Sequence, residues 1–156
     1  MEKLKPQKTT IALNKKALSD YEIIRDFECA IKLLGHEVKS IRDKHLNIKA
    51  SFVIIRDWRI YIEKMHVTPY KMLWNKTSMD PESERELFIH KKDMLYISQK
   101  IKEKWLTLVP TEIYFRWNLI KVSVALAKWR KLFEKKQRLK ERDIEMDMKK
   151  SIKERI

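Results

Sequence analysis

The side chains best suited to catalytic or metal chemistry in this sequence are four histidines and one cysteine, and they stand far apart. None of His36, His45, His66 and His90 has another His, a Cys or a carboxylate at a spacing typical of a metal site. Cys29 lies in an apolar stretch, which favours a buried and inert thiol over a nucleophile. With one glycine, the chain has no glycine-rich loop to cradle a phosphate. We therefore predict that the protein is not an enzyme and has no catalytic residue, metal site or cofactor.

Positive charge is the more prominent chemical feature of the chain. It has 36 Lys and Arg residues against 22 Asp and Glu residues, a net charge of +14. Such a surplus favours an anionic partner, a phosphate backbone or an acidic membrane surface, and a merely solvated basic surface is the alternative. Aromatic residues in expected loops favour RNA, because unpaired bases stack on such rings. These residues are Trp58, Tyr70, Trp74 and Trp117.

The sequence has no signal for export or for a membrane span. No stretch approaches the roughly 18 apolar residues that a spanning helix requires. Lys15 and Lys16 interrupt the apolar residues near the N-terminus, which argues against a secretory signal. A single cysteine fits a reducing compartment. We predict a cytoplasmic protein with no membrane partner.

Apolar spacing predicts the elements that position these groups. The expected strands are residues 21–33 with an irregularity near Ile24, a hairpin within 51–67 with its turn at 56–59, and 106–115 and 119–127. A helix is the alternative for residues 21–33. The expected helices are residues 37–42 and 90–104. Residues 1–13 are expected to be a mobile lead-in, and residues 68–86 a long loop. Because glycine is so rare, tight turns must use Asn, Asp or strained residues. The pattern predicts a mainly β fold, an antiparallel barrel with helices outside it.

The composition changes after Ala127, so we divide the chain into a barrel, residues 1–127, and a basic tail, residues 128–156. The tail has 12 Lys and Arg residues, 6 Asp and Glu residues, and no proline or glycine. Ile144, Met148 and Ile152 recur every four residues as a thin apolar stripe, which is weak support for an isolated helix. We predict a tail that becomes helical when it binds a partner.

A longer motif occurs in the middle of the barrel region. It reads Gly35-His36-Glu37-Val38-Lys39-Ser40-Ile41-Arg42, then Asn47-Ile48 and Ser51-Phe52. Other blocks in a matching order are residues 11–17, 27–30, 66–70, 108–110, 121–122, 134–136 and 139–142. Together they resemble the SsrA-binding protein (small protein B) family, whose signature is Gly, a variable residue, Glu-Val-Lys-Ser-Leu/Ile-Arg, Asn-Leu/Ile and Ser-Tyr/Phe. The resemblance runs from about residue 9 to residue 143.

The resemblance implies both a fold and a function. The implied fold is a six-stranded antiparallel OB-like barrel with flanking helices and a basic C-terminal tail that is helical when bound. Members of the family bind the tRNA-like domain of tmRNA (SsrA RNA) and deliver it to stalled ribosomes for trans-translation, that is, ribosome rescue and peptide tagging. The implied partners are tmRNA, alanyl-tmRNA with elongation factor Tu and GTP, and the stalled ribosome. The tail would occupy the empty mRNA channel, near the decoding centre of the 16S rRNA.

The resemblance also assigns residues to these roles. In the barrel the implied RNA-binding residues are Asn14, Lys15, Lys16, Glu28, Lys39, Arg42 and Lys121. In the tail the implied ribosome-binding residues are Lys128, Lys131, Phe133, Glu134, Lys135, Lys136, Lys140, Glu141 and Arg142. A carboxylate such as that of Glu28 is unfavourable near RNA unless it accepts a hydrogen bond from RNA or holds a basic neighbour. An ion pair within the barrel is the alternative for Glu28.

Some residues depart from the family pattern. Trp58, Trp105 and Trp129 stand where family members usually carry Gly, and Lys44 also replaces a Gly. A left-handed backbone forced on a tryptophan would cost roughly 1–2 kcal/mol. Phe133 stands where His or Tyr is common, at a position expected to stack on rRNA, and a phenyl ring retains the ability to stack.

Two other classes of function fit the composition. A permanent structural protein of the ribosome would share the basic tail and the small barrel, but the Glu-Val-Lys-Ser-Ile-Arg run argues against it. A membrane-surface adaptor would use the tail as an amphipathic helix. The acidic residues Asp143, Glu145 and Asp147 interrupt that stripe, so we rank this class last.

Overall fold

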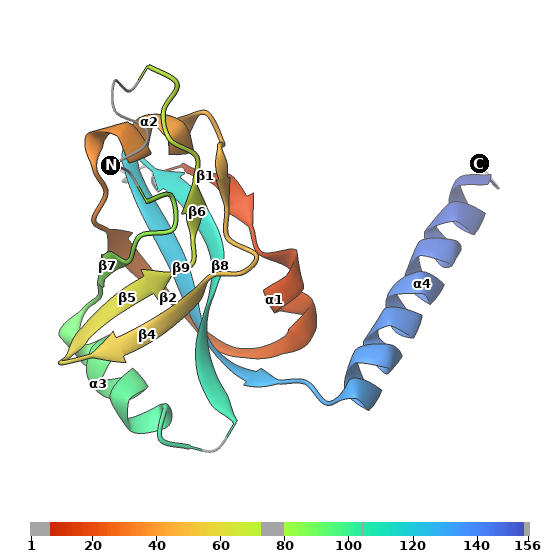
Figure 1. The fold of residues 1–156 in the computed structure, drawn as a ribbon. Helices are drawn as coiled ribbons and strands as arrows, with labels where there is room; N and C mark the ends of the chain where they lie inside the picture. Colours follow the sequence, from red (N-terminus) through yellow and green to blue (C-terminus); the bar gives the residue numbers. More distant parts are fainter. Residues whose placement is uncertain (1–6, 73–79, 104, 155–156) are drawn as a thin grey trace, which may run out of the picture.

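The computed structural model describes residues 7–72, 80–103 and 105–154, and strands dominate it (Figure 1). In chain order the elements are β1 (Lys8–Leu13), α1 (Lys15–Asp20), β2 (Tyr21–Ile31), α2 (Gly35–Arg42), β3 (Leu46–Asn47), β4 (Phe52–Arg56), β5 (Arg59–Glu63), β6 (His66–Val67), β7 (Arg85–Phe88), α3 (Lys91–Lys100), β8 (Leu106–Arg116), β9 (Leu119–Trp129) and α4 (Leu132–Glu154). Within the described residues, no helix is both long enough and apolar enough to cross a membrane.

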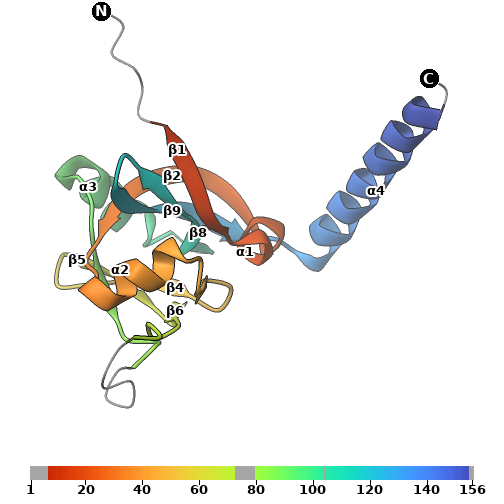
Figure 2. The same cartoon turned by 90° about the horizontal axis from the view of Figure 1, so that it is seen from above.

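Seven strands form one antiparallel sheet in the order β1-β8-β9-β2-β7-β5-β4, and β3 pairs separately with β6. The prediction of a mainly β, antiparallel fold with helices outside the sheet is confirmed. The count of six strands is wrong, and the sheet is not closed, because β1 and β4 end the hydrogen-bonded order. β4 nevertheless comes close to β8, so the sheet curls into an open barrel (Figure 2). This curled sheet is called the barrel below.

One element near the N-terminus differs from the mobile lead-in expected for residues 1–13, and an unpredicted helix follows it. Residues Lys8–Leu13 form β1 and pair with Glu112–Arg116 of β8. The run Thr9-Thr10-Ile11 is rich in β-branched residues, which suit a strand, although its outer side chains are polar. Helix α1 follows directly, because Asn14 caps it by accepting a hydrogen bond from the Ala17 amide at 3.1 Å.

The expected strands and helices elsewhere are largely confirmed. The irregularity predicted near Ile24 is a register shift between Ile23 and Arg25 in the β2–β9 ladder. Within the predicted hairpin Arg56 pairs with Arg59, so Asp57 and Trp58 make the turn. The predicted helix at 90–104 is shorter and ends at Lys100. Of the predicted loop, residues 85–86 belong to β7, and residues 73–79, including Trp74, lie outside the described part.

Apolar side chains fill the inside of the barrel and are covered at its ends by helices. Ile62, Ile113 and Val122 on the strands are fully buried. α2 and α3 lie at opposite ends of the barrel (Figure 1), where Ile41 and Ile97 complete the core. A second, smaller cluster lies under α1, where Ala17 packs on Val109, Ala125 and Ala127.

A buried ion pair joins α2 to the start of β7. The Arg85 guanidinium contacts the Glu37 carboxylate, and the side chains are only 3% and 7% exposed. Arg85 also donates to the carbonyls of Met65 and Pro81, at 2.8 and 3.1 Å. Glu37 accepts the amide hydrogen bond of Leu34 at 3.2 Å. The glutamate of the signature motif therefore holds the chain around residues 81–85 against α2.

The turns confirm the consequence expected from scarce glycine. Among the described residues, Lys44, Asp57, Trp58, Lys64, Trp105 and Trp117 have φ between 52° and 75°. Trp58 and Trp105, two of the three tryptophans at expected glycine positions, therefore have the left-handed backbone that favours glycine. The third, Trp129, ends β9 without a left-handed backbone.

Candidate nucleic-acid interface

The outer face of the barrel carries a row of polar side chains across β8, β9 and β2. Lys121 pairs with Tyr114 on one side and with Ala30 on the other. The next residue, Val122, is fully buried in the core. Because side chains alternate along a strand, Lys121 faces outward, on the side to which Glu28 also contributes. The register of three strands thus brings two residues that are distant in sequence to one patch.

Glu28 lies at the centre of this patch and forms ion pairs with two basic side chains. Its carboxylate oxygens lie 2.6 Å from Arg116 Nη1 and 3.4 Å from Lys121 Nζ. Burial raises the pKa of Glu28, but a hydrogen bond from the Tyr114 hydroxyl and the charges of the two cations outweigh it. The pKa therefore lies below its ordinary value, and the carboxylate is ionised at neutral pH. The ion pair expected as the alternative for Glu28 is present in the structure.

Tyr114 supports the same carboxylate from β8. Burial, followed by its hydrogen bond to Glu28, raises the pKa of the Tyr114 hydroxyl, which stays protonated and donates. Lys8 Nζ lies 4.4 Å from the centre of the Tyr114 ring and 2.7 Å from the Glu112 carboxylate. Three cationic side chains, of Lys8, Arg116 and Lys121, are thus fixed around two carboxylates. We call this group the Glu28 patch.

The Glu28 patch is an arrangement suited to phosphate. It gathers three cations, and each cation is held by an ion pair instead of moving freely in solvent. Holding a charged side chain in place beforehand reduces the entropy lost when a ligand binds. The Glu28 carboxylate acts here as the group that orients Arg116 and Lys121.

Asn14 has a structural role in this structure. Its side chain is 2% exposed. Besides capping α1, its amide donates to the carbonyls of Pro110 at 3.0 Å and Ile48 at 3.3 Å. Asn14 thereby joins α1 to β8 and to the segment after β3. An RNA contact by Asn14 stays a prediction.

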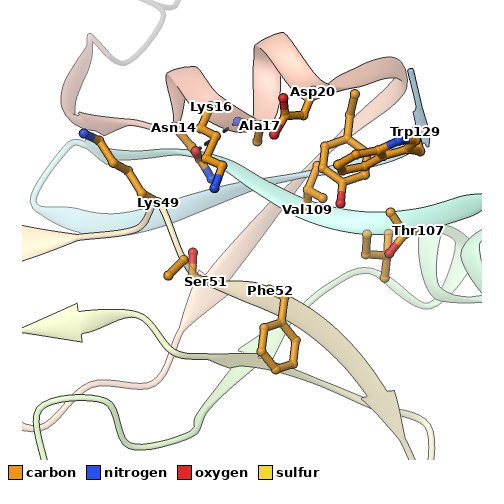
Figure 3. A pocket seen from close by; sticks show the side chains of 13 residues that line it. Asn14, Lys16, Ala17, Asp20, Lys49, Ser51, Phe52, Thr107, Val109 and Trp129 are labelled. Atoms are coloured by element: carbon orange, nitrogen blue, oxygen red, sulfur yellow. Dashed lines mark hydrogen bonds between the residues drawn. The ribbon is translucent and has the colours of Figure 1, made fainter. Parts of the chain in front are cut away.

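Lys15 and Lys16 are exposed in the first turn of α1. Lys16 lines a cavity of about 310 Å³ between α1 and the start of β4 (Figure 3). Lys49 lies at one end of this cavity, and Trp129 at the other. Phe52 lines its floor and is 40% exposed. Lys16 and Lys49, with the rings of Phe52 and Trp129, make a second basic surface, separate from the Glu28 patch.

Lys39 and Arg42 occupy the last turn of α2, and both are exposed. Lys39 Nζ lies 5.3 Å from the centre of the Tyr70 ring, a distance typical of a cation–π contact. Both basic residues belong to α2, whereas Glu28 and Lys121 belong to β2 and β9. The seven predicted barrel residues are thus spread over the Glu28 patch, α1 and α2.

The predicted tail residues follow the end of β9 and the start of α4. Lys128, Lys131 and Glu134 are exposed, and Glu134 accepts the Lys131 amide hydrogen bond at 3.4 Å. Of the predicted residues further along α4, Lys136, Lys140, Glu141 and Arg142 are also exposed. The side chain of Phe133 lies outside the described part of the structure.

The first turns of α4 dock on the end of α1. Lys135 Nζ lies 3.4 Å from the Asp20 carboxylate and 3.8 Å from the centre of the Trp129 ring. Arg138 donates to the Leu18 carbonyl at 3.2 Å. The Trp129 ring also meets Tyr21 edge to face, with centroids 5.0 Å apart. Beyond these contacts α4 extends away from the barrel (Figure 1).

The sequence-based prediction missed Lys8, Tyr114 and Arg116. The signal for two of them was available, because a two-residue turn at Trp117-Asn118 sets the register of β8 and β9. That register places Tyr114 opposite Lys121 and Arg116 opposite Leu119. Lys8 had no such signal, since it depends on β1 pairing with a strand about a hundred residues later.

The titratable groups that suggest catalysis or metal binding are not brought together. Among residues 7–72, 80–103 and 105–154, no three His, Cys, Asp or Glu side chains are placed to hold a metal ion. Cys29 is fully buried, and burial raises the pKa of its thiol to about 12. The prediction that the protein is not an enzyme stays a prediction.

Comparisons with known proteins agree with the resemblance seen in the motifs. The family model described as "SmpB protein" matches residues 11–154. The "SsrA-binding protein" of Sulfurihydrogenibium sp. is 42% identical over 146 residues, which cover 94% of this chain and 95% of that protein. The "SsrA-binding protein" of Mycoplasma mycoides subsp. mycoides SC is 41% identical over 135 residues, 86% of this chain and 91% of that protein.

A solved structure gives the same answer for the fold. A chain from "tmRNA-SmpB: a journey to the center of the bacterial ribosome" superposes with a TM-score of 0.64 at 35% sequence identity. The superposition covers 78% of this chain and 85% of that chain. Sequence relatives that span nearly the whole length and a matching fold lead to one conclusion: this chain belongs to the SmpB protein family, the family of the SsrA-binding proteins.

Proposed function

We propose that this chain binds the tRNA-like domain of tmRNA with its barrel and takes part in trans-translation. The observation that carries the proposal is the Glu28 patch, where ion pairs hold Lys8, Arg116 and Lys121 on an otherwise well-packed sheet. A folded RNA presents phosphates at fixed positions, so cations held at fixed positions favour it over a flexible polyanion. Membership of the SmpB family supports the choice of RNA.

The tail gives the second half of the proposal. α4 has 23 residues and would reach about 34 Å at about 1.5 Å per residue. Its outer part is exposed on all sides, and it carries the cations Lys140, Arg142, Lys149 and Lys150 together with acidic residues between them. We place this helix in the empty mRNA channel of a stalled ribosome, where its cations would face rRNA phosphate. Alanyl-tmRNA with elongation factor Tu and GTP would be the cytoplasmic complex that brings the chain there.

Replacing Lys121 by alanine tests the barrel half. We expect Lys121→Ala to weaken binding to an RNA with the tRNA-like shape and to reduce the slope of log affinity against log salt by about one unit. The measurement is a binding titration at several salt concentrations. Lys102→Ala is the matched control, because Lys102 is exposed and precedes β8 at the end opposite Arg116.

Two results would count against this role for the Glu28 patch. One is a salt slope that is the same for Lys121→Ala and for the unaltered chain. The other is an equal loss of affinity in the Lys102→Ala control, which would indicate a diffuse effect of net charge. Sequencing of the RNA that co-purifies with the protein tests the identity of the partner independently.

A further inference from the structure

A small aromatic and basic pocket lies where the barrel meets the tail. It is a cavity of about 220 Å³, lined by Trp105, Lys128, Trp129, Lys131 and Glu134. Leu106 pairs with Lys128 in the β8–β9 ladder. Trp105 directly precedes Leu106, and Trp129 directly follows Lys128. Two tryptophans therefore leave the same end of the ladder and line one space, which we call the junction pocket.

Both indoles of the junction pocket are accessible. Trp105 is 63% exposed. Trp129 is still 48% exposed, although Tyr21 and Lys135 contact its ring. Large aromatic rings that gather at the surface are typical of binding sites, because exposing them to water is unfavourable. The geometry of this pocket calls for a ligand with a flat apolar face.

The charges around the pocket narrow the chemistry of that ligand. Aromatic pockets also bind methylated amines through cation–π contacts. Here Lys128 and Lys131 stand exposed beside the rings and repel a cationic ligand. An anionic chain with aromatic groups can stack on the rings and pair with the lysines, and single-stranded nucleic acid has this chemistry. We propose that the junction pocket binds one unpaired RNA base, stacked on the tryptophans, with the adjoining phosphates near Lys128 and Lys131.

Glu134 adds a hydrogen-bond acceptor to the pocket. Its carboxylate is one of the lining groups and accepts the Lys131 amide hydrogen bond at 3.4 Å. A carboxylate repels phosphate but accepts hydrogen bonds from the exocyclic amino group of a base. The pocket therefore favours a base with an amino group over uracil.

This site is distinct from the Glu28 patch in place and in the form of RNA that it takes. Lys121 lies near the start of β9, and Trp129 is the last residue of that strand. The inference rests on the proposed function in that the partner is RNA, and Lys128, Lys131 and Glu134 are among the tail residues expected to contact the ribosome. The Glu28 patch is proposed to bind a folded shape, and the junction pocket an unpaired base.

Replacing Trp105 by glycine tests the proposal without straining the fold. Trp105 has φ of 75°, so glycine removes the ring and also relieves the backbone. We expect Trp105→Gly to weaken binding of the full chain to a short oligoadenylate by about tenfold, since a stacked base contributes about 1–3 kcal/mol. Fluorescence anisotropy of a labelled oligoadenylate measures this. Trp105→Phe should recover part of the loss.

Trp58→Gly is the matched control, because Trp58 is 68% exposed and also has a left-handed backbone. We expect it to bind oligoadenylate as the unaltered chain does. Equal losses in Trp58→Gly and Trp105→Gly, or no loss in Trp105→Gly, would overturn the proposal.

Binding to tRNA-shaped RNA, measured in the same proteins, separates this proposal from the proposed function. We expect both glycine variants to keep that affinity. If the unaltered chain does not bind the folded RNA, the proposed function fails while the oligoadenylate result still stands. If oligouridylate binds as tightly as oligoadenylate, the role of Glu134 is refuted.

Discussion

Several residues of this glycine-poor chain have a left-handed backbone, and this conformation is unfavourable for residues other than glycine. Trp58 and Trp105 hold φ of 61° and 75°. Such a conformation costs an L-residue roughly 1–2 kcal/mol, whereas glycine adopts it freely. The Trp58 ring is 68% exposed, so little packing offsets the cost there. The chain thus keeps strain in two surface turns.

Relief of that strain is measurable at Trp58. We expect Trp58→Gly to raise the free energy of unfolding by about 0.5–1 kcal/mol, because the relieved strain exceeds the entropy that glycine adds to the unfolded chain. Urea denaturation measures the change. The same substitution at Trp129 should have the opposite sign, because Trp129 is not left-handed and contacts Tyr21 and Lys135. A lower stability of Trp58→Gly would contradict this account.

The low pKa of Glu28 makes a pH-dependent contribution to stability. A carboxyl group whose pKa is lower in the folded state binds its proton more readily after unfolding. Its contribution is therefore fully present above the ordinary value of 4.5 and is lost as the pH falls through the folded-state pKa. We expect the unaltered chain to lose more stability than Glu28→Gln between about pH 6 and about pH 3. Parallel stability curves for the two proteins would refute this.

At the scale of elements, the buried pair of Glu37 and Arg85 joins α2 to β7. Removing one partner leaves an uncompensated buried charge, which typically costs about 3–5 kcal/mol. We expect Arg85→Met to lower the free energy of unfolding by an amount in this range, as measured in urea. Arg85 also donates to three backbone carbonyls, and these would lose a partner as well.

Two further variants give this prediction its controls. Glu103→Gln removes the exposed pair of Lys100 and Glu103, and we expect a change of less than about 0.5 kcal/mol. The double variant with Glu37→Gln and Arg85→Met should lose less free energy of unfolding than the two single variants lose in sum, because neither buried charge is left alone. Strict additivity would show that the two residues act independently.

The elements that the sequence predicts well are those with a local signal. The β4–β5 hairpin and the β8–β9 hairpin have short turns between β-branched runs, and α2 has helical spacing. β1 and α1 were missed for opposite reasons. β1 has polar outer residues and depends on a distant partner strand, and α1 is a six-residue helix with a single buried residue, Ala17. The predicted count of six strands came from the family resemblance. The pairing of neighbouring strands does not by itself tell how many strands the sheet has.

At the scale of the whole molecule, barrel and tail are expected to have separable roles. Ending the chain after Lys131 removes α4 but leaves the Glu28 patch intact. We expect this truncated chain to bind tRNA-shaped RNA nearly as tightly as the full chain and to abolish peptide tagging in a trans-translation assay. Lys121→Ala, by contrast, should weaken binding to tRNA-shaped RNA. Tagging by the truncated chain would refute the division of roles.

The candidate site was only partly predictable from the sequence. Glu28 and Lys121 were assigned together, and the structure joins them in one ion-paired patch. Asn14 was assigned to RNA, but its burial depends on Pro110 and Ile48, which the sequence does not place beside it. The junction pocket was missed, because it needs the ends of β8, β9 and the start of α4 to meet. Contacts between distant segments are what the sequence alone left out.

The way α4 is attached has a mechanical consequence. Its described contacts with α1 come from Lys135 and Arg138, which both lie near its N-terminal end. The helix is thus a lever about 34 Å long with its fulcrum at one end. A tilt of about 10° at that fulcrum would swing the tip by about 6 Å, slightly more than one helical pitch. A small change in how Lys135 and Arg138 contact α1 would therefore shift the distant cations Lys149, Lys150 and Lys153 by several ångströms.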